Sequence, residues 1–251
     1  MAAEIDVAPE LLEKVTNAFR KGVDENKTLR AAAARITAGR GGFPQAERIA
    51  QEIGKELTAA CERYLTAESL PNGRLYYNIA DRVLRPNLEE GYTESQYYTG
   101  QVVDQANSRA GIGMRASYQE LDTDRIQGII DAVSAKEVVE ESMQYLREPL
   151  INLFQSAVTG MAEHNARVAY ESGLRPRIVR TAEGGACKWC QDLAGDYSYP
   201  VANQEVYHRH EFCRCTVEYF PGEKNRGQKQ DVWTKSWSTA EQIAERSTFG
   251  L

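Results

Sequence analysis

Residues 136–176, KEVVEESMQYLREPLINLFQSAVTGMAEHNARVAYESGLRP, hold the longest regular hydrophobic pattern in the chain. Apolar residues recur there at spacings of four and three, which predicts a long amphipathic helix with one apolar seam. The seam consists of Val139, Met143, Leu146, Leu150, Leu153 and Ala157. Pro149 lies inside the pattern and is expected to kink or restart the helix, whereas Gly173 is placed as a C-cap. We interpret the seam as core, with contact to another chain as the alternative.

Helical patterns also fill the sequence before this stretch. They predict helices at 8–36, about 44–66, 75–85 and about 88–119, and a short helix capped by Asp122 or Thr123. Pro86 is expected to end the third of them, because proline lacks the N–H that a helix interior needs. Cys61 lies within a helical pattern and is predicted to be a small buried hydrophobe.

The hydrophobic period changes after Pro176. Residues 177–181 and 216–220 are rich in β-branched and aromatic side chains, which predicts two short strands. The predicted fold is therefore mainly α, with an elongated multi-helix body, a small α+β module and a C-terminal tail. The predicted segments are an N-terminal helical region (1–135), the long helix with the small module (136–221), and a polar linker and tail (222–251).

Composition excludes several classes of protein. Hydrophobic residues make up 42% of the chain and charged residues 26%, which is typical of a folded globular protein. No apolar run approaches the roughly 18–20 residues that span a bilayer. Residues 1–14 carry acids where a signal peptide would carry basic residues, which predicts synthesis in the cytosol. A net charge of −6 argues against a protein that coats duplex DNA.

Cysteines are concentrated in one short stretch. Four of the five lie within 187–215, in the motifs Cys187-Lys-Trp-Cys190 and His208-Arg-His210-Glu-Phe-Cys213-Arg-Cys215. In a cytosolic chain such clustering favours a metal site over disulfides. A Cys-x-x-Cys turn places two thiolates close enough to share one tetrahedral ion, which points to zinc.

The motifs offer more ligands than one zinc ion accepts. Cys187, Cys190 and Cys213 are predicted ligands, and either His210 or Cys215 completes the set. We favour His210, because an extended segment would leave Cys215 pointing into a small core beside the metal. Reduced thiols that bind nothing are the alternative. The module has too few apolar residues to fold on burial alone, whereas zinc contributes about 10–16 kcal/mol in small zinc peptides.

A zinc ion with four protein ligands is suited to structure rather than to catalysis. The order of motifs differs from that of zinc deaminases, and the spacing differs from His-Glu-x-x-His of metalloproteases. The alternative is a zinc-dependent nuclease or hydrolase that uses His208, His210 and Glu211. Residues 216–251 contain no further histidine for such a site. We therefore predict that the protein is not an enzyme.

At this point the order of motifs resembles a known family. Residues from about 135 to 220 resemble the C-terminal module of phage minor head proteins of the Mu F-like head-morphogenesis family. The resemblance is carried by the helix 161–170, the strand 177–182, the two Cys motifs, Leu193-Ala-Gly195 and Pro200. Glu211 replaces the usual Pro, and Gly184-Gly185 stands where Asp is common, but neither change removes a candidate ligand.

The resemblance implies a structural virion protein present in few copies inside the head. It would associate with the portal protein, with major capsid or scaffold proteins as further partners, and support head morphogenesis, DNA packaging or DNA ejection. It would be made in the host cytoplasm and end in the head interior near the portal. The acidic balance suggests that any contact with packaged genomic DNA is local or indirect. Neither a membrane nor a small-molecule substrate is expected.

Overall fold

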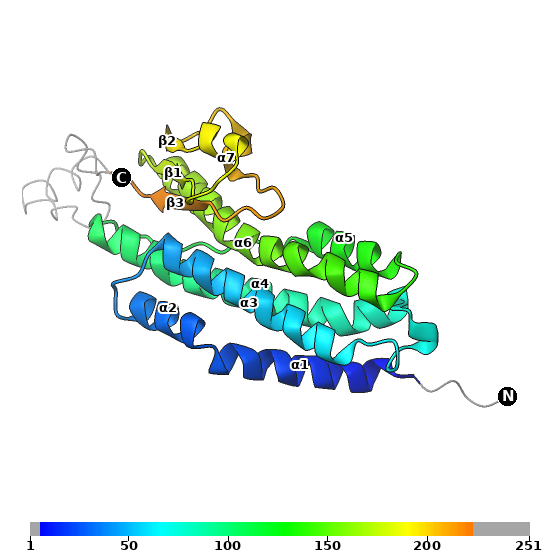
Figure 1. Cartoon of the computed structure of the whole chain (residues 1–251). Helices are drawn as coiled ribbons and strands as arrows, with labels where there is room; N and C mark the ends of the chain where they lie inside the picture. Colours follow the sequence, from blue (N-terminus) through cyan, green and yellow to red (C-terminus); the bar gives the residue numbers. More distant parts are fainter. Residues whose placement is uncertain (1–5, 223–251) are drawn as a thin grey trace, which may run out of the picture.

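The computed structural model describes residues 6–222, which form an elongated helical bundle with a small sheet on one side (Figure 1). The bundle helices are α1 (Ala8–Glu25), α2 (Lys27–Thr37), α3 (Phe43–Tyr64), α4 (Tyr77–Arg109), α5 (Thr123–Ser134) and α6 (Val139–Glu171). They are followed by β1 (Arg177–Thr181), α7 (Lys188–Asp192), β2 (Gly195–Ser198) and β3 (Thr216–Phe220). Residues 177–220 are called the Cys/His module below. The predicted linker and tail, 222–251, lies outside the described residues apart from Gly222.

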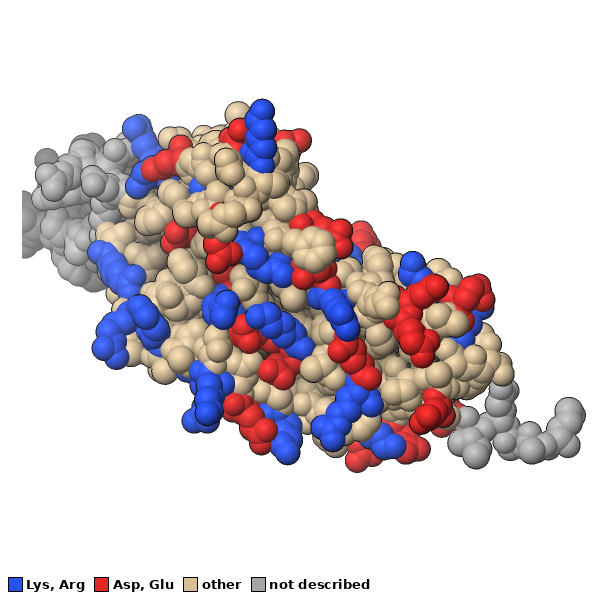
Figure 2. Space-filling model, viewed as in Figure 1, with Lys and Arg blue, Asp and Glu red and all other residues tan. Residues whose placement is uncertain are grey.

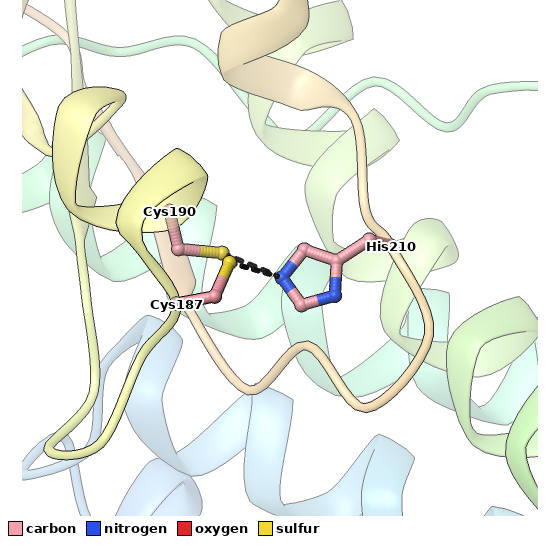
Figure 3. A group of neighbouring side chains, drawn as sticks. All are labelled: Cys187, Cys190 and His210. Atoms are coloured by element: carbon pink, nitrogen blue, oxygen red, sulfur yellow. Dashed lines mark hydrogen bonds between the residues drawn. The ribbon is translucent and has the colours of Figure 1, made fainter.

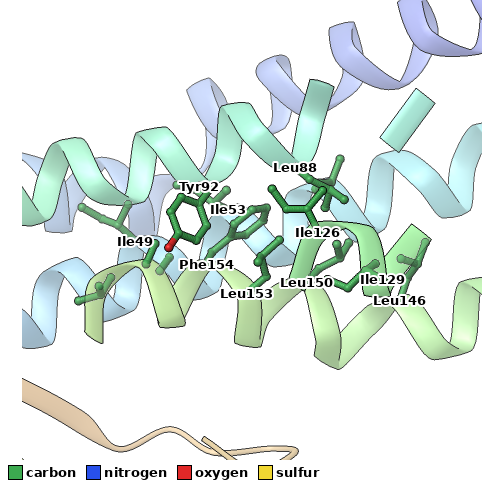
Figure 4. Close-up of a cluster of buried hydrophobic side chains, with 14 of the residues drawn as sticks. Ile49, Ile53, Leu88, Tyr92, Ile126, Ile129, Leu146, Leu150, Leu153 and Phe154 are labelled. Carbon is green, nitrogen blue, oxygen red and sulfur yellow. The ribbon is translucent and has the colours of Figure 1, made fainter. Parts of the chain in front are cut away.

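The centre of the bundle is the contact between α3 and α6 (Figure 4). Ile53 of α3 and Phe154 of α6 are both fully buried there. Gly54 permits this close approach, because a Cβ at that position would lie 2.8 Å from the Ile151 backbone. The predicted seam of α6 is buried along its whole length, which confirms its interpretation as core.

The expected end at Pro86 is wrong, and the helix does not restart at Pro149. Both α4 and α6 continue through their prolines. Leu84 and Leu88, on either side of Pro86, are completely buried, so tertiary packing outweighs the local cost of the proline. The Asn87 side chain also donates a hydrogen bond of 2.7 Å to the Val83 carbonyl, in the turn that the proline disturbs.

The single helix predicted at 8–36 is also wrong, because it is divided at Asn26. The Asn26 side-chain oxygen accepts a hydrogen bond from the Leu29 N–H at 2.9 Å and so caps α2. Its amide nitrogen donates to Glu52 and Glu56 of α3 at 3.0 and 2.7 Å. Asn26 thus ends α1, caps α2 and is hydrogen-bonded to α3, and the chain changes direction there.

The helix expected at 88–119 stops earlier, at Arg109, and Gly111 then adopts a positive φ of 68°. The following segment is held against α6 by Asn165, whose side chain exchanges hydrogen bonds of 2.8 and 2.9 Å with the Ser117 backbone. The predicted cap at Asp122 is confirmed, since its carboxylate accepts from the Arg125 N–H at 3.0 Å. The chain is thereby led into α5.

The sheet has the order β2-β1-β3, with both pairings antiparallel. The predicted strands 177–181 and 216–220 are confirmed, whereas β2 and α7 were not predicted. Ile178, Arg180 and Tyr219 are buried. The Tyr219 hydroxyl donates to Asn107 of α4 at 3.0 Å, so the sheet is tied directly to the bundle. No helix among residues 6–222 is both long and apolar enough to cross a membrane.

Candidate metal centre

The first two candidate ligands are brought together by α7. Cys187 is the N-cap of this short helix and Cys190 lies within its single turn. A helical turn places residues three apart on one face, so both sulfur atoms face the same side. Figure 3 shows them directed at the imidazole of His210, which comes from the loop before β3.

His210 is oriented as a metal-binding histidine usually is. Its Nε2 lies 3.2 Å from the Cys187 Sγ and 2.9 Å from the Cys190 Sγ. Its Nδ1 contacts the carbonyl oxygen of Glu211, which can only accept a hydrogen bond. When Nδ1 donates to this carbonyl in a neutral imidazole, the lone pair of Nε2 faces the two sulfurs.

Cys213 and Cys215 also lie close to Cys190. Cys190, Cys213 and Cys215 form a second group of close ligand atoms, and all three side chains are buried. The two groups share Cys190, so the structure gathers all five predicted ligands around one sulfur. Cys187 is exposed, which places the group of Cys187, Cys190 and His210 at the surface and the other group beneath it. Cys61 is buried in α3, as predicted.

The pairs of atoms around Cys190 have spacings close to those of a tetrahedral ion, but the five candidate ligands form two overlapping groups and not one in which all atoms lie within 4.8 Å of one another. Two thiolates at 2.3 Å from a shared zinc lie roughly 3.8 Å apart, and the Cys190 and Cys213 sulfurs are 3.8 Å apart. The sulfur–nitrogen contacts of His210 are shorter than the roughly 3.6 Å that a shared zinc imposes, so binding would widen them by less than about 1 Å. Thiolate and imidazole ligands together suit zinc among the common metal ions.

The buried thiols differ in the direction in which their pKa is shifted. The pKa of Cys213 lies well below its ordinary value, chiefly because Cys215 donates a hydrogen bond to its sulfur. Burial raises the pKa of Cys190. The Cys213 sulfur is thus the buried ligand atom best prepared to be a thiolate.

Arg180 is a residue of the site that sequence reasoning missed. It lies on the central strand β1 and is 1% exposed. Its Nη1 donates to the carbonyl oxygens of Val206 and His208 at 2.5 and 2.8 Å. Its Nη2 lies 3.7 Å from the Cys190 sulfur and 3.8 Å from the Cys213 sulfur. The alternation of the predicted strand, with Ile178 facing inward, was the signal that would have placed Arg180 inward as well.

Two arginines anchor the ligand-bearing loop to the bundle. The Arg209 side chain is 2% exposed, pairs with the equally buried Glu47 of α3 and donates to the Thr159 hydroxyl of α6 at 2.7 Å. Burial raises the pKa of Glu47 to about 7, although the Arg209 charge opposes this shift. Arg214 bonds both oxygens of Glu148 at 3.0 Å. The two anchors, Arg209 and Arg214, therefore flank the candidate ligands His210 and Cys213.

The residues of the hydrolase alternative do not converge. His208 and Glu211 are both exposed, and neither belongs to a metal-binding group among the described residues. His208 contributes its backbone carbonyl to Arg180. Of the three residues in that alternative, only His210 faces the thiols.

Comparison with known proteins gives one match. A family model described as "VG15 protein" matches residues 95–240, which is more than half of the chain. The matched segment begins within α4 and includes α5, α6 and all five candidate ligands. No curated protein and no solved structure matches the chain.

Proposed function

The chain belongs to the VG15 protein family, a viral and phage gene-product family, and from this premise we propose that it is a minor head protein of a phage. It lies inside the head, associated with the portal, and supports head morphogenesis, DNA packaging or DNA ejection. The observation that carries the proposal is that the matched segment contains the entire Cys/His module. The resemblance of the same module to Mu F-like minor head proteins points to the same role.

In this proposal the Cys/His centre holds a structural Zn²⁺. Cys187, Cys190, Cys213 and His210 are its ligands, and Cys215 is a buried thiol beside it. The Nε2 lone pair directed at two sulfurs supports His210 as the fourth ligand. Four protein ligands leave no open position for water, which suits a structural role. The metal would supply the cohesion that the small apolar content of the module does not.

The portal protein is the principal partner in this proposal. The chain is acidic overall, and basic and acidic side chains are interspersed over the face of the bundle seen in Figure 2. Extensive binding to DNA needs many basic contacts to phosphates, so any contact with the packaged genome is local. Major capsid or scaffold proteins are further partners during assembly.

A zinc-dependent hydrolase is the less supported alternative. It needs a general base beside the metal and a position for water. Glu211 is exposed and turns only its backbone carbonyl towards His210. Loss of a hydrolytic activity in Glu211→Ala, with metal content and fold retained, would favour this alternative over ours.

The decisive experiment is co-purification of the protein with its portal, combined with metal analysis of the same sample. The wild-type protein should carry about one zinc per chain and co-purify with portal. The double variant Cys187→Ser/Cys190→Ser should lose zinc and fail to enter heads, because two ligands are gone. Cys61→Ala is the matched control, since it removes a thiol that lies in α3, outside both metal-binding groups. A double variant that is folded and supports infectious heads would contradict the proposal.

A further inference from the structure

Arg180 is a buried cation whose partners are unusual. Burying a charge is costly unless an opposite charge compensates it. Yet within residues 6–222 no carboxylate forms an ion pair with Arg180. Its partners are three backbone carbonyls and the sulfurs of Cys190 and Cys213. Among its hydrogen-bond and ion-pair partners in residues 6–222, only the sulfurs can carry a full negative charge.

The charge of the centre explains this arrangement. Neutral thiols are weak hydrogen-bond acceptors and would not compensate a guanidinium, whereas metal-bound thiolates would. Three thiolates, one neutral histidine and one Zn²⁺ leave one net negative charge, which a single guanidinium cancels. Because this inference concerns the metal centre, it rests on the proposed zinc site.

We propose that Arg180 is the counter-charge of the metal centre and a determinant of its affinity for zinc. The carbonyls of Val206 and His208 hold one edge of the guanidinium, so its other edge stays directed at Cys190 and Cys213. The guanidinium also lies over the Trp189 ring, with its central carbon 5.3 Å from the ring centroid. The cation is thus fixed before the metal binds, and it lowers the cost of gathering thiolates in a buried place.

The first test compares Arg180→Gln with Arg180→Lys by competition against a zinc chelator. Loss of a residue that supports the ligands of a metal typically weakens binding 10- to 100-fold, and this is expected for Arg180→Gln. Arg180→Lys keeps the charge and should recover part of the loss. Arg177→Gln is the matched control on the same strand, because Arg177 pairs with Asp196 rather than with sulfur. It should bind zinc as the wild type does.

A spectroscopic readout separates a counter-charge from a packing role. In the Co²⁺-substituted protein, a nearby cation stabilises the sulfur electrons and raises the energy of the thiolate-to-cobalt absorption band. The band should therefore move to longer wavelength in Arg180→Gln, less so in Arg180→Lys, and not at all in Arg177→Gln. An unmoved band together with unchanged zinc affinity in Arg180→Gln would overturn the proposal.

Arg180→Gln can also be tested in a protein that carries a second substitution, which keeps the test informative if Arg180→Gln weakens the fold of the module. Cys187 is exposed, so Cys187→His can replace one thiolate by a neutral ligand and remove the excess charge of the centre. The loss of affinity from Arg180→Gln should be smaller in this background. Equal losses in both backgrounds would assign Arg180 to packing. Wild-type protein that binds neither Zn²⁺ nor Co²⁺ would instead refute the metal site itself, so the two failures are distinguishable.

Discussion

The helical bundle and the Cys/His module are built on different physical grounds. In the bundle, α3, α4, α5 and α6 share a continuous apolar interior (Figure 4), which extends into the sheet of the module through Ile178, Val217 and Tyr219. In the module, three thiols form a separate buried cluster and an arginine lies next to them. Apolar burial needs no ligand, whereas a cluster of thiols and charges is stable only when its charges are matched. The bundle should therefore fold unaided, whereas the thiol-bearing loops of the module should depend on the proposed metal.

Removal of the metal is expected to produce the largest difference in stability between the bundle and the module. A chelator should disorder residues 183–215 while the bundle keeps its helices, because zinc contributes about 10–16 kcal/mol in small zinc modules. Amide hydrogen exchange should show protection lost in the module and retained in α3 and α6. Uniform loss of protection along the chain would show that the two regions are one cooperative unit.

A substitution in the core of the bundle serves as the control for metal removal. Phe154→Ala removes a fully buried ring from the bundle and should lower its stability by about 3–5 kcal/mol. Zinc content should be unchanged, because Phe154 belongs to the apolar core and not to either metal-binding group.

The next effect in size concerns the ion pair that joins the two regions. Arg209→Met leaves Glu47 buried without its cation, which should destabilise the folded chain by about 3–5 kcal/mol. Urea denaturation measures this loss, and Glu47→Leu/Arg209→Met should recover most of it, because no buried charge remains. Additive losses from the two single changes would show that the residues do not act as a pair.

The same pair predicts a dependence on pH. The pKa of Glu47 rises from its ordinary 4.5 to about 7 on folding, so the folded chain holds this proton more tightly than the unfolded chain. The corresponding stabilisation is fully present below pH 4.5 and is lost as pH rises through about 7. Glu47→Gln should lack this component, so the difference in unfolding free energy between the two proteins should change across this window.

The smallest expected effect is at the tip of the ligand-bearing loop. Phe212 has a φ of 60° and is 64% exposed, so a bulky residue is strained there and buries little surface. Phe212→Gly relieves strain of about 1–3 kcal/mol and loses part of that gain to the greater freedom of the unfolded chain. Thermal unfolding of the zinc-loaded module should show a net gain of about 1 kcal/mol. A loss of stability would reveal a packing role for the ring.

The parts of the structure that correspond to regular patterns in the sequence could be predicted from it. The seam of α6, the strands 177–181 and 216–220 and the proximity of the five candidate metal ligands all follow from patterns within short stretches of the sequence. The continuity of α4 through Pro86 could not be predicted, because it depends on burial against distant helices. Arg209 was missed for the same reason, whereas for Arg180 the alternation of its strand indicates burial but not its partners. Their roles depend on partners that only the folded chain brings near, such as Glu47.

The pairing of Glu47 with Arg209 also has a consequence for the order of folding. The two residues are 162 positions apart, so their contact closes a very long loop. The entropy cost of closing this loop is offset only after the helices between them have assembled. During synthesis the Glu47 carboxylate of α3 stays exposed to water until Arg209 has been made, near the end of the described chain. The same arginine precedes His210, a ligand of the proposed zinc site, so docking of the module and binding of the proposed ion should be the last steps of folding.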